Sequence, residues 1–288
     1  MLTADLTSEP SDDRMNVMIY AGVAGDRNDR GMKGAAIIGA RIASEVGFRA
    51  QVVASSAPII EGGWREQLRH ASASLRQLRD SLAGQLCAGG RFIVTMGRCA
   101  AGVATLPVIA RRFPDAAIVW FDAHGDCNVP TEGDADDGRY LGGMVISGAA
   151  GEWDTGLGKG LDLANVILVG ARELDLPEQA RVDCGQIRLV AVGPGLAGRL
   201  KAAVGRRRVY IHLDCDVLSA GLLATEYQCP DGLSFDELRA ALAALAEGDV
   251  LGLEIAEYED CWPDGRENRP DALVSALRPL IESLKTSR

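Results

Sequence analysis

The sequence has little aromatic content, no long apolar run and no excess of positive charge. Aromatic residues make up 5% of the 288 residues, whereas glycine occurs 34 times, and this balance suits a turn-rich α/β protein better than a β-sandwich. Since no stretch of about 18 uninterrupted apolar residues is present, we expect no membrane span. The formal net charge of −10 disfavours nucleic acid or an anionic membrane as a partner.

Cysteine pairs at the spacing of redox or zinc motifs are also missing. The seven cysteines are scattered without a CxxC pair, and their odd number argues against a disulfide framework. We therefore expect a reducing, cytoplasmic environment, in which most of these thiols pack as small hydrophobic side chains. Residues 1–14 carry several acids and no apolar core, so we expect a flexible N-terminal tail there and one domain over residues 15–288.

Short apolar runs alternate with amphipathic stretches along the rest of the chain. The runs are 16–22, 49–55, 91–97, 116–122, 165–171, 186–192, 208–214 and 250–256. Several are apolar nearly throughout, which is typical of strands covered on both faces. The clearest amphipathic stretches are 64–86, 102–113, 234–248 and 269–284, the third with a capping-box start at Ser234 and Glu237. The alternation predicts a three-layer α/β/α fold with a mainly parallel central sheet, and ligands beyond the carboxyl ends of its strands.

Acidic side chains stand at the ends of two of these runs. One run leads into Asp122, His124 and Asp126, and another leads into Asp214 and Asp216. Residues two apart on an extended backbone share one side, so each set faces one way. Either set alone would be typical of a solvated loop. Together they would bury several carboxylates at strand ends, which requires cations, and they suit two bridged metals such as Mn²⁺ better than one catalytic zinc.

The segments around these acids resemble the motifs of a known enzyme family. FDAHGDCN (121–128) resembles the DAHxD motif of the ureohydrolases, the family of arginase and agmatinase, and HLDCDVL (212–218) looks like the second DxD segment of that family. The similarity extends through LGLEIAEYE (251–259) and covers the chain from about residue 16 onward. The resemblance implies an arginase-like α/β fold, a centre of two Mn²⁺ ions and hydrolysis of a guanidino-type C–N bond by a metal-bridging hydroxide.

The resemblance also implies roles for the individual acids. Asp122 and Asp214 would bridge the two metals. Asp126 would complete one metal site and relay a proton to the leaving amine, whereas His124 and Asp216 would complete the other site.

Three further residues match substrate-binding positions of the family. Glu257 matches the carboxylate that orients the guanidino group. Asn128 and Asp175 match positions that hold the amino-acid end of the substrate, although for Asp175 a surface-loop acid is an equally open interpretation.

Two departures from the family pattern bear on the substrate. Cys99 stands where the family has a metal-binding histidine in a GGDHS segment, and Gly142 stands where it has a second active-site histidine. A Cys99 thiolate would add negative charge to the metal centre, whereas a neutral thiol turned away would cost one metal a ligand. Cys99 could also be only a packed small residue. In the first two cases we expect a weaker metal centre, with one site poorly occupied.

A weaker centre suits a more reactive substrate. An N-hydroxyguanidine is less basic than the guanidinium of arginine, and the space at Gly142 would admit its hydroxyl group. With these two changes the sequence resembles ureohydrolases that convert Nω-hydroxy-L-arginine into hydroxyurea and L-ornithine in antibiotic biosynthesis. We adopt this activity as the hypothesis. The alternatives are an ordinary arginase or agmatinase and a catalytically inactive relative. The family resemblance also leaves a homo-oligomer open.

Five other residues lie in or near the motifs. We expect His212 to orient an aspartate from behind rather than to ligate a metal. Arg139 and Tyr140 would either contact a substrate carboxylate or begin the next helix. Cys127 and Cys215 alternate out of phase with the acids, so we expect them to pack away from the metals.

Overall fold

The computed structural model describes residues 15–48, 50–131 and 139–286. The predicted flexible tail, residues 1–14, lies outside these ranges. Within them, one sheet contains strands from residue 15 to residue 256, and a single domain over 15–288 stays our proposal.

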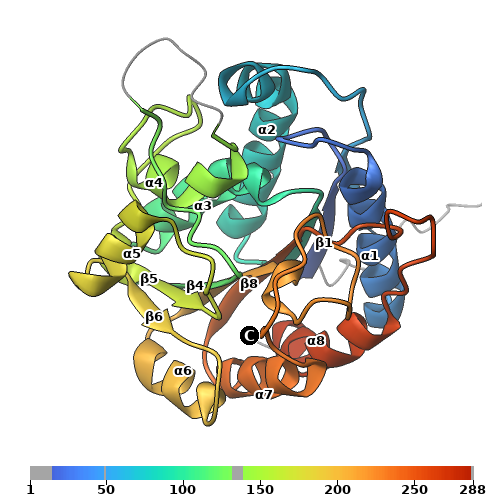
Figure 1. Cartoon of the computed structure of the whole chain (residues 1–288). Coiled ribbons are helices and arrows are strands. Elements are labelled where there is room, and N and C mark those ends of the chain that lie inside the picture. Colours follow the sequence, from blue (N-terminus) through green and yellow to red (C-terminus); the bar gives the residue numbers. More distant parts are fainter. Residues whose placement is uncertain (1–14, 49, 132–138, 287–288) are drawn as a thin grey trace, which may run out of the picture.

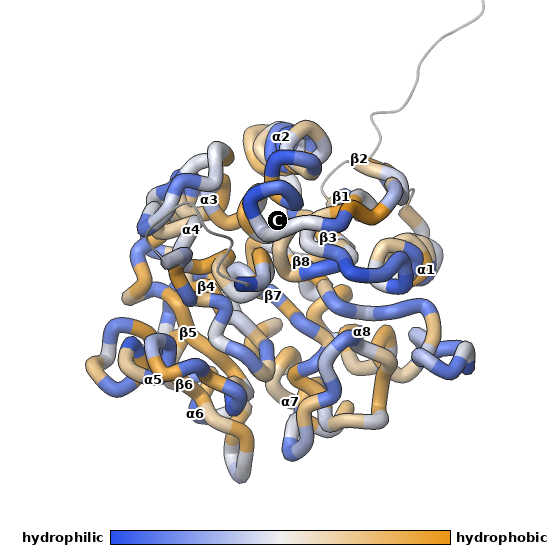
Figure 2. The backbone as a smooth tube through the Cα atoms, turned by 45° about the horizontal axis from the view of Figure 1, so that its top comes forward, coloured by the Kyte–Doolittle hydropathy of each residue, from blue (hydrophilic) through white to orange (hydrophobic). Residues whose placement is uncertain are grey.

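Eight strands form the centre of the molecule (Figure 1). They are β1 (Met15–Tyr20), β2 (Ala50–Ala54), β3 (Arg91–Met96), β4 (Ala117–Phe121), β5 (Val166–Val169), β6 (Arg188–Val190), β7 (Val209–Asp214) and β8 (Val250–Ala256). Their order in the sheet is β2-β1-β3-β8-β7-β4-β5-β6, and every neighbouring pair is parallel. Each predicted run overlaps one of these strands, and β1 begins one residue before its run. The central strands are buried throughout, and β5 is apolar along its length (Figure 2).

Helices cover both faces of the sheet, so the predicted three-layer α/β/α fold is confirmed. One face packs against α1 (Arg30–Val46), α6 (Leu196–Val204), α7 (Phe235–Ala246) and α8 (Asp271–Thr286). The other face packs against α2 (Trp64–Cys87), α3 (Gly102–Arg112) and α4 (Val145–Ala150), and the short α5 (Leu176–Asp183) follows β5. All four predicted helices are present. Among the described residues, no helix is both long and apolar enough to cross a bilayer.

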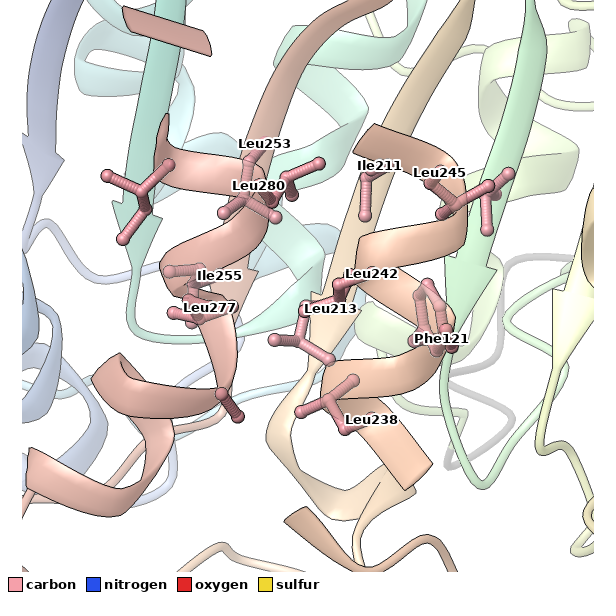
Figure 3. Packing of buried hydrophobic residues seen from close by; sticks show 14 of the residues in the cluster. Phe121, Ile211, Leu213, Leu238, Leu242, Leu245, Leu253, Ile255, Leu277 and Leu280 are labelled. Carbon is pink, nitrogen blue, oxygen red and sulfur yellow. The ribbon is translucent and has the colours of Figure 1, made fainter. Parts of the chain in front are cut away.

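The helices α7 and α8 pack together against one face of the sheet. Figure 3 shows Leu238, Leu242 and Leu245 of α7 beside Leu277 and Leu280 of α8, over the inner strands β7 and β8. The helix α7 begins as predicted, because the Ser234 hydroxyl accepts a hydrogen bond from the Glu237 amide at 3.2 Å and the Glu237 carboxylate accepts one from the Ser234 amide at 2.9 Å. This cap fixes where the apolar face of α7 begins.

The first helix, α1, is not among the helices that the sequence pattern singled out. Its sequence is interrupted by Gly31, Gly34 and Gly39, which weaken the helical signal. Position 34 requires a glycine because the backbone of Tyr258 comes very close. A Cβ atom there would lie 1.8 Å from the carbonyl oxygen of Tyr258. The glycine lets α1 pack directly on the chain that leaves β8.

Truncating the core between α7 and the sheet should destabilise the fold without touching the strand ends. Leu242 is fully buried, so Leu242→Ala should lower the free energy of unfolding by about 2–5 kcal/mol. Urea denaturation followed by circular dichroism measures this change. The control is Leu176→Ala, because Leu176 is 87% exposed and its truncation should cost little. A loss equal to that of the control would contradict the packing described here.

Candidate metal centre

The predicted site residues gather at the carboxyl ends of four neighbouring strands. In the sheet order β3-β8-β7-β4, Cys99 follows β3, Glu257 follows β8, Asp214 ends β7 and Asp122 follows β4. Parallel strands end at the same edge, so these segments, far apart in the sequence, meet there.

The two motifs contact each other through His124. Its Nδ1 atom lies 3.2 Å from Asp122 Oδ1 and 3.1 Å from Asp216 Oδ2. Between the motifs, the amide of Ala123 donates to Asp216 Oδ1 at 3.0 Å, and within the second motif the amide of Asp216 donates to Asp214 Oδ1 at 2.7 Å. Backbone amides thus fix the orientation of the carboxylates at the strand ends.

Cys99 belongs to the same cluster. Its Sγ atom lies 3.0 Å from Asp214 Oδ2 and 3.1 Å from Nε2 of His212, and the side chain is buried. Burial, together with the charge of Asp214, raises the pKa of the Cys99 thiol well above its ordinary value. The thiol therefore stays protonated until a cation offsets the surrounding carboxylates.

Within the described residues, four groups of side chains have ligand atoms close enough to share a metal ion. They are Cys99, Asp122 and His212; His124, Asp216 and Cys229; Cys99, Asp214 and Glu257; and Asp122, Asp214 and Asp216, each with its ligand atoms within 4.8 Å of one another. Asp126 is in none of these groups. It lines the adjacent cavity with φ of 47°, and its Oδ2 atom is buried without a hydrogen-bond partner among the described residues.

The electrostatics of these acids fit bound cations. Burial, with the charge of neighbouring carboxylates, raises the pKa of Asp126 and of Asp214 well above the ordinary value of 3.8. Burial alone would lower the pKa of His124, but the hydrogen bonds and charges of Asp122 and Asp216 outweigh it and raise that pKa. The site destabilises negative charge and stabilises positive charge, which is the environment that a divalent metal requires.

A second layer of buried groups supports the cluster from below. His212 Nδ1 lies 2.6 Å from Glu254 Oε1, and the imidazole stacks on the indole of Trp120 with ring centroids 3.4 Å apart. The indole Nε1 donates to Asp122 Oδ2 at 3.0 Å. We expected His212 to orient an aspartate. Its hydrogen-bond partners are instead Cys99 and Glu254, and it is Trp120 that donates to an aspartate.

A cavity of about 370 Å³ opens above the cluster. Its lining consists of Cys99, His124, Asp126, Asn128, Arg139, Tyr140, Gly143, Met144, Glu173, Asp175, Glu178, Asp214, Asp216, Tyr227 and Glu257. The two residues predicted to hold an amino-acid end contact each other, since Asn128 Nδ2 donates to Asp175 Oδ2 at 2.8 Å. Arg139 and Tyr140 line the cavity, and the next helical turn begins only at Gly142.

The prediction of free space at Gly142 is wrong. A Cβ atom at this position would lie 2.4 Å from Cε1 of Tyr140 and 3.1 Å from its Cζ, so the tyrosine ring lies against the glycine backbone. The Tyr140 hydroxyl is buried without a hydrogen-bond partner among the described residues. Gly142 makes room for Tyr140 rather than for a substrate hydroxyl.

Two charged residues of the site escaped the sequence analysis. Glu178 is buried and accepts hydrogen bonds from the amides of Cys127 and Asp175, both at 3.0 Å, which ties the loop after β4 to the start of α5. Its signal was present, because Glu178 stands three residues after Asp175 as in a capping box. Arg98 is fully buried beside Glu257, and nothing in the local sequence distinguishes it from a surface arginine.

Comparisons with known proteins agree with this geometry. The arginase family model matches residues 35–263, and the chain belongs to the arginase family. Arginase from Bacillus subtilis has the same fold, with a TM-score of 0.75 at 18% sequence identity over 95% of this chain and 99% of that one. The predicted fold is therefore confirmed, as is the predicted enzyme class, a hydrolase of amidino C–N bonds.

Two relatives carry more specific names. The chain is 32% identical over 243 residues to the Nω-hydroxy-L-arginine amidinohydrolase of Streptomyces lavendulae. The aligned region makes up 84% of this chain and 88% of that protein. It is also 28% identical over 195 residues to the proclavaminate amidinohydrolase of Streptomyces clavuligerus. That aligned region makes up 64% of this chain and 59% of that protein.

Restoring a histidine at position 99 should increase the metal content of the protein. A neutral imidazole ligates a divalent metal without the proton that the buried thiol must lose. We expect Cys99→His to bind more Mn²⁺ per chain than the parent when both are dialysed against the same metal and analysed by plasma emission spectrometry. Cys184→His is the matched control, since Cys184 is exposed. Equal metal content in the parent and Cys99→His would remove Cys99 from the metal site.

Metal binding should stabilise the protein more as the pH rises. In the metal-free protein, the raised pKa values of Asp126 and Asp214 mean that the folded state holds protons which unfolded aspartates release above 3.8. The contribution of these two acids to stability is therefore largest in acid, and it falls as the pH rises from 3.8 toward their raised pKa values. A bound metal favours the ionised acids and removes this loss. The difference in Tm between Mn²⁺-loaded and chelator-treated protein should grow with pH, and a constant difference would contradict this account.

Proposed function

We propose that this protein hydrolyses the guanidino C–N bond of Nω-hydroxy-L-arginine and releases hydroxyurea and L-ornithine. The observation that carries the proposal is the position of Cys99, whose Sγ atom lies 3.0 Å from Asp214 within the carboxylate cluster. A thiol in place of a histidine weakens the metal centre, and a weak centre suits an activated guanidine. The similarity to a relative named for this substrate supports the same conclusion.

The acids of the cluster would hold two divalent metals, which we propose to be Mn²⁺. The ligands would be Cys99, Asp122, His124, Asp126, Asp214 and Asp216. When bound, the metals would supply an activated water as the nucleophile and offset the carboxylate charge.

Two side chains of the cavity act directly on the guanidino group. Glu257 lines the cavity and orients the nitrogens of the group, so that the guanidino carbon faces the metal cluster. Asp126, with its buried and unpaired Oδ2 atom, carries a proton to the nitrogen that leaves as the amine of L-ornithine. The oxygen of water stays on the carbon, and the C–N bond to the ornithine side chain breaks.

The other end of the cavity binds the amino-acid part of the substrate. Asp175 offers a carboxylate to the α-ammonium group, and Asn128 has a buried Oδ1 atom without a partner among the described residues. Their mutual hydrogen bond of 2.8 Å holds both in place. The proposed partner is thus a small guanidino-type amino acid, and a homo-oligomer stays an expectation from the family.

The rival activities differ in measurable ways. Metal-loaded protein is incubated separately with Nω-hydroxy-L-arginine, L-arginine and agmatine, and the released product is quantified by mass spectrometry. We expect kcat/KM to be highest for Nω-hydroxy-L-arginine. A preference for agmatine would refute Nω-hydroxy-L-arginine as the substrate. It would leave the role of Asp175 standing, because agmatine lacks the carboxylate but keeps the ammonium group. A chain that never retains metal would be the inactive relative.

Replacing Asp126 should abolish turnover. Asp126→Asn removes the proton carrier and one metal ligand, so kcat should fall by about 100-fold or more. Steady-state kinetics with Nω-hydroxy-L-arginine, together with metal analysis, separates loss of proton transfer from loss of metal. Asp115→Asn is the control, because this exposed acid lies just before β4. Activity near that of the parent would discard the role of Asp126.

A further inference from the structure

A buried arginine lies beside the candidate metal centre and plays no part in the mechanism above. Arg98 follows β3, directly before Cys99, and is 1% exposed. Its guanidinium is surrounded by four carboxylates, those of Asp26 (3.3 Å), Glu226 (3.1 Å), Glu257 (2.7 Å) and Glu259 (2.8 Å).

Two of these carboxylates have a second cation. Arg30 Nε lies 2.7 Å from Glu259, and Arg27 Nη1 lies 3.7 Å from Glu226. In the described part of the chain, Glu257 and Asp26 have no such second arginine, so Arg98 is the arginine that offsets their charge.

Asp26 makes the weaker contact of the two. Its Oδ1 atom lies 3.3 Å from Arg98 Nε, and neither atom has a hydrogen-bond partner among the described residues. Glu257, with the shortest contact to Arg98, is the main counter-charge of the guanidinium.

Both oxygens of Glu257 already accept hydrogen bonds from the protein. Its Oε2 atom accepts from Arg98 Nη1 at 2.7 Å, and its Oε1 atom accepts from the amide of Cys99 at 3.0 Å. The carboxylate that faces the guanidino group of a substrate is thus already paired with a guanidinium of the chain itself. It retains lone pairs for hydrogen bonds, but its negative charge is compensated.

This pairing changes which guanidines the cavity accepts. A guanidinium cation placed against Glu257 would meet the Arg98 cation behind the same carboxylate, and the other acids facing it, such as Asp214 and Asp216, are committed to the metals. An uncharged guanidine can donate hydrogen bonds to Glu257 without that repulsion.

We propose that Arg98 is a specificity-determining residue, which selects uncharged guanidine-type groups over guanidinium cations by compensating the charge of Glu257. The proposal rests on the proposed function in one respect, namely that Glu257 is the carboxylate that faces the reacting group. It adds that the substrate binds with its guanidine group uncharged. An N-hydroxyguanidine reaches this state far more readily than arginine does, because it loses its proton more easily.

The test compares two ligands that differ in side-chain charge and share the same amino-acid end. L-arginine carries a guanidinium and L-citrulline an uncharged ureido group, so contributions from Asn128 and Asp175 cancel in the ratio of their dissociation constants. Titration calorimetry of the full-length, Mn²⁺-loaded protein at neutral pH measures both. The parent should bind L-citrulline at least as tightly as L-arginine, and L-arginine tighter by about tenfold or more would overturn the proposal without any variant.

Variants then assign the selection to Arg98. The double variant Arg98→Met with Asp26→Asn removes one charge of each sign. The net charge of the cluster stays the same, but Glu257 loses its counter-charge. The ratio should shift toward L-arginine by about tenfold or more, because coupling between close buried charges is of this size. Arg98→Lys keeps the cation and should keep the parent ratio. An unshifted ratio in the folded, metal-loaded double variant would refute the proposal.

A neighbouring arginine supplies the control. Arg30 pairs with Glu259 in the same cluster, so Arg30→Met should leave the ratio unchanged, and an equal shift would mean that general loss of charge is the cause. The binding ratio does not depend on turnover. A protein that shows the predicted ratios but releases no hydroxyurea would refute the proposed function alone, whereas turnover with unshifted ratios would refute the role of Arg98 alone.

Discussion

The structure depends on the compensation of negative charge at one edge of a parallel sheet. The strands β3, β8, β7 and β4 lie side by side; the last three deliver carboxylates to one buried edge, and β3 delivers Arg98 and Cys99 to it. Such a concentration of acid opposes folding unless positive charge lies among it. The rest of the site, from the orientation of each aspartate to the protonated thiol of Cys99, follows from how that charge is supplied.

The molecule supplies it in two different ways within one cluster of strand ends. Around Asp122, Asp214 and Asp216 the protein leaves room for ions that come from solution, and it stiffens the ligands from behind through Trp120 and His212. Around Glu257 and its neighbours it uses a side chain of its own. Metal ions can exchange and take part in chemistry, whereas the charge of the Arg98 side chain is permanent. The reacting group of a substrate would lie between the two.

Local sequence patterns predicted most of the fold and part of the site. The apolar runs of the central strands are covered on both faces, whereas the edge strands β2 and β6 are partly exposed. The acids at the ends of β4 and β7 came together because parallel strands end at one edge. The helix α1 was harder to predict, since Gly34 serves contact with Tyr258 rather than helix formation. Arg98 and Tyr140 depend on partners far away in the sequence, so their surroundings could not be read from their own segments. The catalytic roles of the acids stay predictions.

The contact between Tyr140 and Gly142 has a consequence for how such a site could change over time. The ring at position 140 and any side chain at position 142 compete for one volume, since even a methyl group there would overlap the ring. A histidine at 142 therefore requires the ring at 140 to move or to be replaced. A route of single substitutions toward a histidine-bearing relative meets no overlap only if position 140 changes before position 142.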